Sequence, residues 1–246
     1  MPSADARIRA VAALALLAVG LVAGGCDTTQ QKSARAKLQA TRLLASRRAV
    51  VVRQTDPRIA VQSATLVRGP RASAVVVRLR NHGPTTLQDL PVTVGLRRPG
   101  RHPLLLNARR GVPYLQTHAP AIAAGGQATW VFVARRRVPH GGRVFARVGP
   151  PAPGSGPARK RLVSLRAAAP AARAGALSVS VENPTAVPQY GLDVYAYVTR
   201  AGRYVAAGRA AIAHLGTGSR RSIRLRLVGN PRGGVVHVLA PPSTLR

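Results

Sequence analysis

The chain has 246 residues and a formal net charge of +32, because 38 lysines and arginines face only six aspartates and glutamates. This length suffices for one large domain or two ordinary ones, and the charge predicts attraction to anionic lipid, teichoic-type polymer or nucleic acid that weakens as salt rises. The single cysteine excludes an internal disulfide, and the 3% aromatic content predicts a core made mostly of Val, Leu, Ile and Ala.

The first 25 residues have the three parts of an export signal. Arg7 and Arg9 precede an apolar run over residues 10–21, and small residues follow at 23–25. The apolar run is shorter than the roughly 20 residues that span a bilayer. We therefore expect a signal peptide over residues 1–25 rather than an uncleaved membrane anchor.

The only cysteine, Cys26, follows this segment directly in the sequence Val22-Ala23-Gly24-Gly25-Cys26. The segment resembles the lipobox of bacterial lipoproteins, in which small or aliphatic residues precede an obligatory cysteine. The resemblance implies cleavage before Cys26 and a diacylglyceryl thioether on its thiol, and two acyl chains such as palmitate hold a protein firmly at a membrane. We expect a lipid-anchored protein on the extracytoplasmic face of the cell membrane. The alternative is a stray thiol after simple secretion.

Residues 26–57 predict a basic tether that is partly helical. Good helix formers run over residues 27–49 without Pro or Gly, and Thr28 or Thr29 is placed to cap a helix ending at Arg48. The lysines and arginines here suit a tether lying along anionic headgroups, with about 1 kcal/mol for each cation near a charged surface. A solvated spacer is an equally good interpretation.

Beyond residue 50 the apolar period becomes two residues, which predicts strands, and the chain repeats itself. Residues 77–83 return as 179–185, an offset of 102 (179 minus 77). The later turn Ile122-x-x-Gly125 returns as Leu215-x-x-Gly218, an offset of 93 (215 minus 122). The second copy therefore lacks about ten residues across 104–117 of the first.

The repeat predicts an all-β fold of two tandem immunoglobulin-like β-sandwiches, over residues 58–149 and 159–246. A Pro/Gly linker over 150–158 joins them. Strands over 59–67 and 161–167 are expected to open the two copies, and an asparagine-centred corner is expected after the second strand of each.

The spaced aliphatic residues, the asparagine and the later Leu/Ile-x-x-Gly turn resemble bacterial immunoglobulin-like modules. The first copy is similar to the cell-adhesion-related (CARDB-type) group, and the second to the FxLYD-type domains of secreted prokaryotic proteins. Membership of such families implies binding or spacing at the cell surface and passes on no catalytic residues.

The sequence offers no constellation for catalysis or metal binding. Paired carboxylates for acid–base chemistry would have to come from Asp89, Glu182 and Asp193, which we expect to pair with arginines instead. The six histidines lack metal-ligand spacing, and neither a phosphate loop before a helix nor a nucleophile-elbow motif occurs. We predict a protein that is not an enzyme and that needs neither metal nor cofactor.

Two groups of aromatic residues lie in predicted strands. Trp130 and Phe132 align through the repeat with Ile223 and Leu225, whose neighbouring arginines face water, so we expect both aromatics in the core rather than in an exposed patch. A tyrosine-rich face with nearby arginines is the candidate binding face, since both residue types dominate interface hot spots. Its members are Tyr190, Tyr195, Tyr197, Tyr204, Arg220, Arg221, Arg224 and Arg226. The alternative for the tyrosines is cross-strand packing on a solvent face.

The leading functional hypothesis is a lipid-anchored envelope protein that acts as a noncatalytic binding or spacer module, with an envelope protein or anionic polymer as its partner. One alternative is electrostatic binding of anionic envelope polymers, lipid headgroups or extracellular DNA, without specific nucleic-acid recognition. The other is an accessory subunit of a transporter or envelope enzyme.

Overall fold

The computed structural model describes Ala36 and residues 49–151, 164–168 and 175–243. The expected signal peptide, Cys26, most of the tether and most of the linker lie outside these described residues. Within them the chain forms thirteen strands and one short 3-10 helix, η1 (Tyr114–Gln116), so the predicted all-β fold of two tandem sandwiches is confirmed. No helix of the described part is long and apolar enough to cross a membrane.

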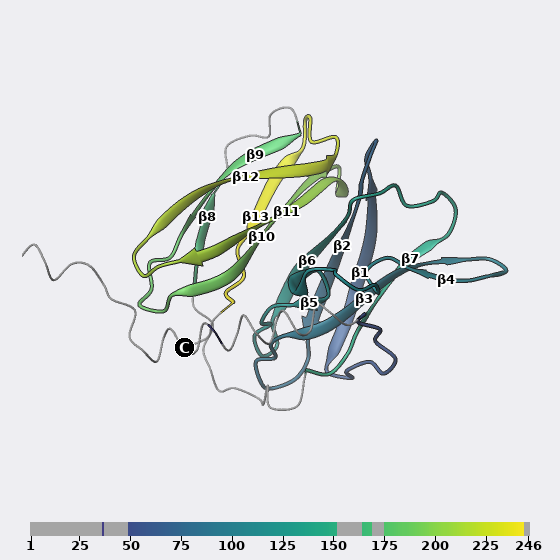
Figure 1. Cartoon of the computed structure of the whole chain (residues 1–246), viewed down its shortest axis with the longest axis horizontal. Coiled ribbons are helices and arrows are strands. Elements are labelled where there is room, and N and C mark those ends of the chain that lie inside the picture. Colours follow the sequence, from purple (N-terminus) through teal and green to yellow (C-terminus); the bar gives the residue numbers. More distant parts are fainter. Residues whose placement is uncertain (1–35, 37–48, 152–163, 169–174, 244–246) are drawn as a thin grey trace, which may run out of the picture. The chain divides into compact units, whose positions relative to one another are not determined.

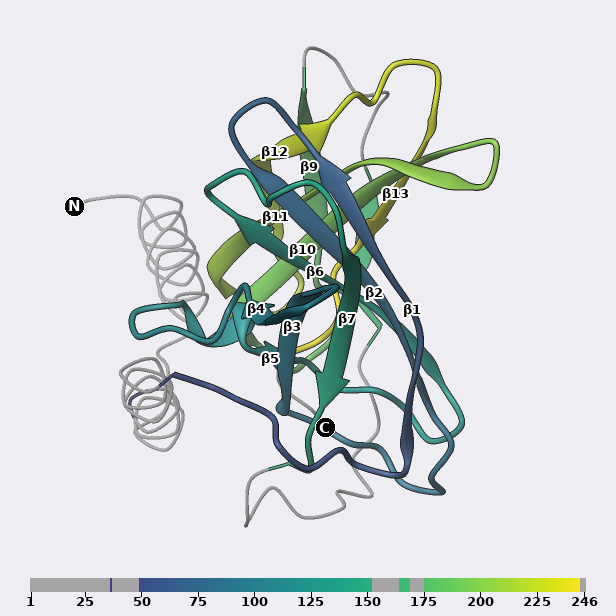
Figure 2. The same ribbon diagram turned by 90° about the vertical axis from the view of Figure 1, so that its right-hand side faces the viewer.

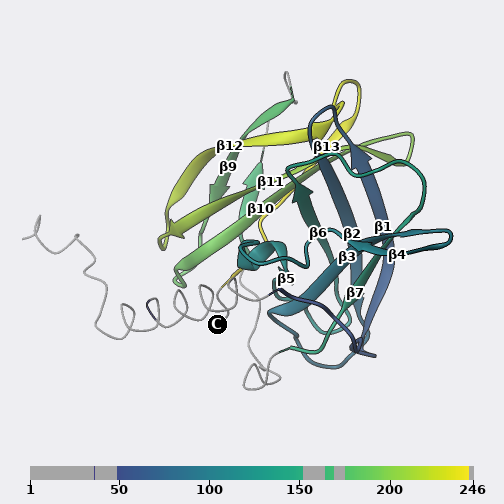
Figure 3. The ribbon, with the colours of Figure 1, turned by 45° about the vertical axis from the view of Figure 1, so that its right-hand side comes forward.

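The first sandwich consists of two antiparallel sheets (Figure 1). One sheet has the order β1-β2-β6, and these strands lie side by side in Figure 2. Its strands are β1 (Ile59–Arg68), β2 (Ser73–Asn81) and β6 (Gln127–Ala134). In the other sheet β3 pairs with β4, β5 and β7, and the β3–β4 hairpin projects beyond its neighbours (Figures 1 and 3). Its strands are β3 (Leu90–Arg98), β4 (Arg101–Leu105), β5 (His118–Ala119) and β7 (Arg143–Val148).

The second sandwich uses the same strand pairings, but its two halves join into one six-stranded sheet of order β13-β10-β11-β12-β9-β8. Its strands are β8 (Arg166–Ala168), β9 (Ala176–Glu182), β10 (Gln189–Arg200), β11 (Arg203–Leu215), β12 (Arg220–Gly229) and β13 (Val235–Leu239). β8 thus covers only the end of the opening strand expected over 161–167, whose residues up to 163 lie outside the described part.

β11 and β12 join the two halves through three residue pairs, and glycine makes this close approach possible. Gly208 pairs with Leu227, and a Cβ on Gly208 would lie 2.1 Å from the Arg226 carbonyl oxygen. Gly229 has φ +97°, and a Cβ there would lie 2.2 Å from the Val205 carbonyl oxygen. Any larger residue at either position would separate the strands.

The pairing register reproduces the repeat deduced from sequence. Val77 of β2 pairs with Trp130 of β6, and their counterparts Val179 and Ile223 pair in the second sandwich. Trp130 is 0% exposed, and its indole Nε1 donates to backbone carbonyls. Phe132 is also buried, so the core placement of both aromatics is confirmed.

A buried asparagine closes the same corner in each sandwich. The Asn81 side-chain amide donates to the carbonyl oxygens of Thr85, Ile122 and Ala123, at 2.7, 3.3 and 3.0 Å. Asn183 repeats this arrangement. Its acceptors are the carbonyl oxygens of Val187, Leu215 and Gly216, at 2.9, 3.5 and 3.0 Å. In each sandwich the asparagine corner is thus hydrogen-bonded to the Leu/Ile-x-x-Gly turn of the repeat.

The residues that only the first copy carries follow β4 and pack along the edge of β3. Asn107 is fully buried there, and it accepts from the Val94 amide at 2.9 Å and donates to the carbonyls of Val92 and Gln116 at 2.7 and 3.0 Å. The second copy has no such segment, and its β11 instead pairs with β10 over nearly its whole length. The extra segment therefore replaces the second half of a strand and ends in η1.

Candidate functional site

The two faces of β10 have different surroundings. Leu192, Val194 and Ala196 face the interior of the second sandwich. Tyr195 points the other way and belongs to the core cluster of the first sandwich, which also contains Val76 and Val131. Residues from Arg42 onward form one compact unit, so this apolar contact joins the two sandwiches.

Tyr195 therefore lies on neither a ligand face nor a solvent face, the two positions that the sequence suggested for it. It is 0% exposed, because Ala207 and Val228 of the second sandwich and the outer face of the β1-β2-β6 sheet cover it. Strand alternation showed which side of β10 it occupies, but alternation cannot reveal what covers that side.

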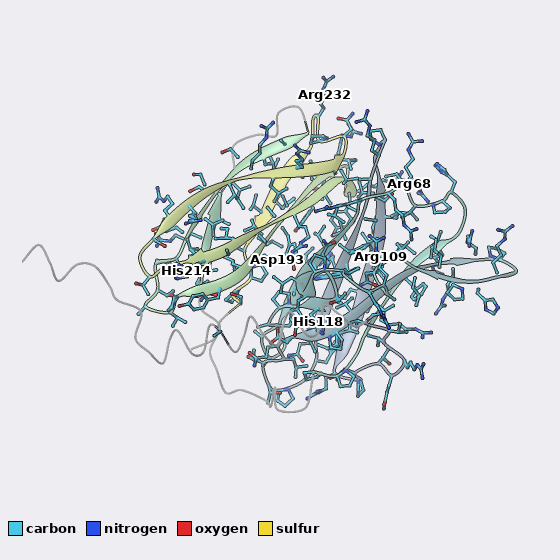
Figure 4. The ribbon with its side chains drawn as sticks, viewed as in Figure 1. Arg68, Arg109, His118, Asp193, His214 and Arg232 are labelled. Atoms are coloured by element: carbon cyan, nitrogen blue, oxygen red, sulfur yellow. The ribbon has the colours of Figure 1, made fainter. Side chains whose placement is uncertain are left out.

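A buried polar cluster accompanies Tyr195 at this contact. Tyr195 Oη donates to Asp193 Oδ2 at 2.9 Å, and Arg209 of β11 forms an ion pair with the same carboxylate. The Gln116 amide, with its oxygen facing Arg209, accepts from Arg209 Nη1 at 2.9 Å and donates to the Val133 carbonyl at 2.9 Å. We name Gln116, Asp193, Tyr195 and Arg209 the interdomain cluster; Asp193 is labelled in Figure 4.

The environment of the interdomain cluster fixes its protonation. Burial, together with the nearby Asp193 charge, raises the pKa of Tyr195 well above its ordinary value of 10.0. Tyr195 is thus a neutral hydrogen-bond donor to a charged acceptor, a stronger type of bond than one between two neutral groups. The cluster is a structural contact, not a site open to substrate.

A cleft of about 1200 Å³ lies between the same two sandwiches. Three aromatic side chains form one wall: Tyr197 stacks on His237 with ring centroids 4.7 Å apart, and Tyr204 meets Tyr197 edge-on at 5.3 Å. Thr199 Oγ1 lies 3.0 Å from His237 Nε2 and orients that ring. All these residues come from β10, β11 and β13, whereas the opposite wall comes from β1, β2 and β6.

The cleft is positively charged. Arg78 and Arg203 line it, and no carboxylate lies among its described lining residues. Burial and the neighbouring Tyr197 raise the pKa of Tyr204, while the positive charge of Arg78 opposes that rise. Neutral hydrogen-bonding groups complete the surface. They are the side chains of Ser63, Thr65, Gln127, Thr129, Ser164 and Thr199.

The structure brings together only part of the candidate binding face. Tyr197 and Tyr204 line the cleft, whereas Tyr195 is in the interdomain cluster. Tyr190 lies near the start of β10, where it is 8% exposed and stacks on His214 with ring centroids 4.9 Å apart (His214 is labelled in Figure 4).

The four candidate arginines lie on β12 and do not line the cleft. All four are exposed, and Arg220 pairs with Glu182 at 2.7 Å. That hydrogen bond lowers the pKa of Glu182. Arg224 lies opposite Ser178 on β9, and Arg226 lies opposite Ala176. This exposed basic face and the cleft are separate sites.

The described carboxylates are mostly committed to arginines. Asp193 pairs with Arg209 and Glu182 with Arg220, as expected from the sequence. Asp56, 2% exposed, bonds to Arg58 at 2.6 Å, which holds its pKa below the ordinary value despite burial. In the described ranges no group of three His, Cys, Asp or Glu is placed to hold a metal ion.

Comparison with known proteins shows remote likeness to solved structures alone. No family model matches the chain. No curated protein matches it either. Among solved structures it is similar to a crystal structure of red sea bream transglutaminase, with 16% identity and a TM-score of 0.22. The match covers 87% of this chain but 32% of that one.

The interdomain cluster and the cleft beside it were not predicted from the sequence. One signal was available, because Gln116 belongs to the segment that the second copy lacks. A segment present in one repeat alone is a natural candidate for a contact between unlike surfaces. The acidic partner was also visible, since Asp193 is two residues from Tyr195 and therefore lies on the same face of the strand.

Proposed function

We propose that the chain is a lipid-anchored protein of the extracytoplasmic cell envelope and acts as a noncatalytic binding module. The observation that carries the binding role is the open cleft between the sandwiches, with aromatic rings on one wall and arginines at its surface. The lipobox ending at Cys26 supports the location.

The state of the carboxylates supports a noncatalytic role. General acid–base catalysis needs a titratable group that reaches substrate. Asp193 is buried in an ion pair, and Asp56 is held in another by Arg58. Asp89 and Asp193 share only a void of about 10 Å³, room for about one water molecule.

Membrane fractionation of cells that express the full chain tests the location. We expect the wild type to stay in the membrane fraction in 1 M salt and Cys26→Ser to move to the soluble fraction with an unchanged melting temperature. Salt separates the lipid anchor from charge attraction, which high salt screens. A Cys26→Ser protein that stays membrane-bound in 1 M salt would contradict the anchor.

Cross-linking in intact cells tests the binding role. We expect a reproducible envelope partner in the cross-linked material. Recovery of a transporter or an envelope enzyme would specify an accessory subunit, whereas recovery of cytoplasmic proteins alone would overturn the envelope location.

A second candidate, electrostatic binding of anionic polymers, is favoured by the basic face of β12. Arg224 and Arg226 are exposed, neither has an acidic residue opposite it in the β9 register, and both lie on the outer side of the sheet. Binding of a polyphosphate probe to this face should weaken steeply with salt, and Arg224→Gln with Arg226→Gln should flatten that dependence. A salt-independent affinity would rule it out.

A further inference from the structure

The cleft differs from the basic face of β12 in what it presents to a ligand. The β12 face carries arginines exposed to solvent, whereas the cleft combines ring faces, neutral hydroxyls and arginines in one site. We propose that the cleft binds a segment of an acidic glycan, a sugar polymer with carboxylate or phosphate groups at intervals. This inference rests on the proposed binding role and names its ligand class.

The aromatic wall supplies the apolar part of such a site. Tyr197, Tyr204 and His237 are each partly exposed and contact one another, so their rings are held in place before a ligand arrives. Tyrosine combines an apolar ring with a polar tip and suits partners that are apolar on one side and wet on the other. A pyranose ring has this character, because its C–H face is apolar and its rim carries hydroxyls.

The opposite wall supplies neutral hydrogen-bonding groups. Ser63 and Thr65 of β1 and Thr129 of β6 line it, and hydroxyls both donate and accept. Sugar hydroxyls require this dual capacity from their partners. A few placed polar groups on a largely apolar surface are the usual means by which a pocket orients its ligand.

The charge of the cleft points to an anionic ligand with widely spaced charges. Among its described lining residues, Arg78 and Arg203 carry guanidinium groups, and arginine suits the bidentate recognition of carboxylate or phosphate. A nucleic acid carries a phosphate on every nucleotide, and grooves that follow its backbone are lined with many cations. Among the described residues, two arginines line this cleft, and so small a number favours the glycan over nucleic acid.

The size of the cleft fits a segment of polymer better than one small molecule. Its volume of about 1200 Å³ exceeds the roughly 300–1,000 Å³ of usual small-ligand pockets, and the cleft is partly open to solvent. An open cleft lets the rest of a long chain extend beyond it into solvent. We therefore expect several sugar units to lie in it.

The test is binding of a fluorescently labelled hyaluronan octasaccharide to the purified full-length Cys26→Ser chain, followed by fluorescence anisotropy. A neutral cello-octaose and an oligo(dT) of similar length serve as competitors. We expect the acidic octasaccharide to bind in 0.15 M salt, and the neutral sugar to compete at least about tenfold more weakly, since it lacks the charge-assisted bonds to arginine.

Matched variants separate the cleft from general charge attraction. Arg203→Gln and Arg224→Gln each remove one exposed guanidinium, one in the cleft and one on β12. We expect a loss of about tenfold in affinity for Arg203→Gln and of less than about twofold for Arg224→Gln. Tyr204→Ala should cause a similar loss to Arg203→Gln, with its melting temperature as a check on folding.

Each other outcome overturns the glycan assignment. Equal losses for Arg203→Gln and Arg224→Gln would leave only unspecific charge attraction. Tighter binding of oligo(dT) that depends on Tyr204 would assign the cleft to single-stranded nucleic acid. No binding of the octasaccharide would remove the ligand class, while membrane fractionation and cross-linking would still decide the proposed function separately.

Discussion

Arg209 on β11 forms an ion pair with Asp193 on the neighbouring strand β10, and both side chains lie in the contact between the two sandwiches. Asp193 is 2% exposed, so its charge depends on Arg209 and Tyr195 for the stabilisation that water would otherwise supply. The other guanidinium nitrogen of Arg209 reaches Gln116 of the first sandwich. The pair thus stabilises both the second sandwich and its attachment to the first.

Asp193→Asn should lower the free energy of unfolding by about 3–5 kcal/mol, because it leaves Arg209 buried without a countercharge. Urea unfolding measures this. The double change Asp193→Asn with Arg209→Leu should recover part of the loss, since it removes the uncompensated charge as well. Glu182→Gln, which breaks an exposed pair, is the control and should alter stability little. Equal effects at the two sites would contradict the burial argument.

Asn81→Asp should destabilise the protein more than Asn81→Ala. The Asn81 amide nitrogen donates to three carbonyl oxygens, and an aspartate oxygen would instead face those oxygens with a negative charge. Loss of the buried hydrogen bonds in Asn81→Ala should already lower the free energy of unfolding by about 1–3 kcal/mol. Asn183→Asp should reproduce the order in the second copy. If Asp were tolerated better than Ala at either corner, the assigned amide orientation would be wrong.

Acid should destabilise the fold partly through Asp56. The Arg58 guanidinium holds the folded-state pKa of Asp56 below its ordinary value of 3.8, so this carboxylate stabilises the folded state above pH 3.8. That stabilisation is lost as the pH falls through the folded-state pKa. Urea unfolding between pH 7 and pH 2.5 should show a smaller fall in stability for Asp56→Asn than for wild type. Parallel curves for the two proteins would exclude the contribution.

Gly208→Ala should disrupt the pairing of β11 with β12. The new Cβ would lie 2.1 Å from the Arg226 carbonyl oxygen, so the strands must move apart, at a cost of about 1–3 kcal/mol or more. Gly216→Ala is the matched control, because its Cβ would approach no atom closer than 3.5 Å. Thermal unfolding should therefore show a lower melting temperature for Gly208→Ala and one near wild type for Gly216→Ala. An unchanged Gly208→Ala protein would show that the strands are not held this close.

Sequence patterns predicted the fold well because its rules are local and repeated. Alignment of the two copies placed Trp130 and Phe132 in the core, and the offset between copies reproduced pairs such as Val179 with Ile223. Asn81 and Asn183 marked corners that the structure closes with the same bonds. Each of these features depends on contacts within one sandwich. Because the chain contains two copies of the sandwich, the sequence shows each pattern twice.

The candidate site could be predicted only in part, since it depends on contacts between sandwiches. The sequence does not distinguish the tyrosines at positions Tyr195, Tyr197 and Tyr204. In the structure Tyr195 is buried in the contact between the sandwiches, whereas Tyr197 and Tyr204 line the cleft. The difference arises from the outer surface of the β1-β2-β6 sheet, which no pattern within β10 encodes. The arginines of β12 are exposed, as the sequence predicts. They do not line the cleft, and this separation depends on how the whole sheet is arranged, which the local sequence does not encode.

The segment that carries Gln116 makes the two copies of the repeat structurally unequal. Two identical copies could be reordered or multiplied along a chain, because each would offer the same surfaces as the other. Here the first copy carries a segment that contacts Arg209 of the second, and β10 of the second carries Asp193 and Tyr195, which its counterpart strand lacks. A pair of two first copies would lack Asp193 and Tyr195, and a pair of two second copies would lack Gln116. The two copies are therefore no longer interchangeable at the surfaces through which they contact each other.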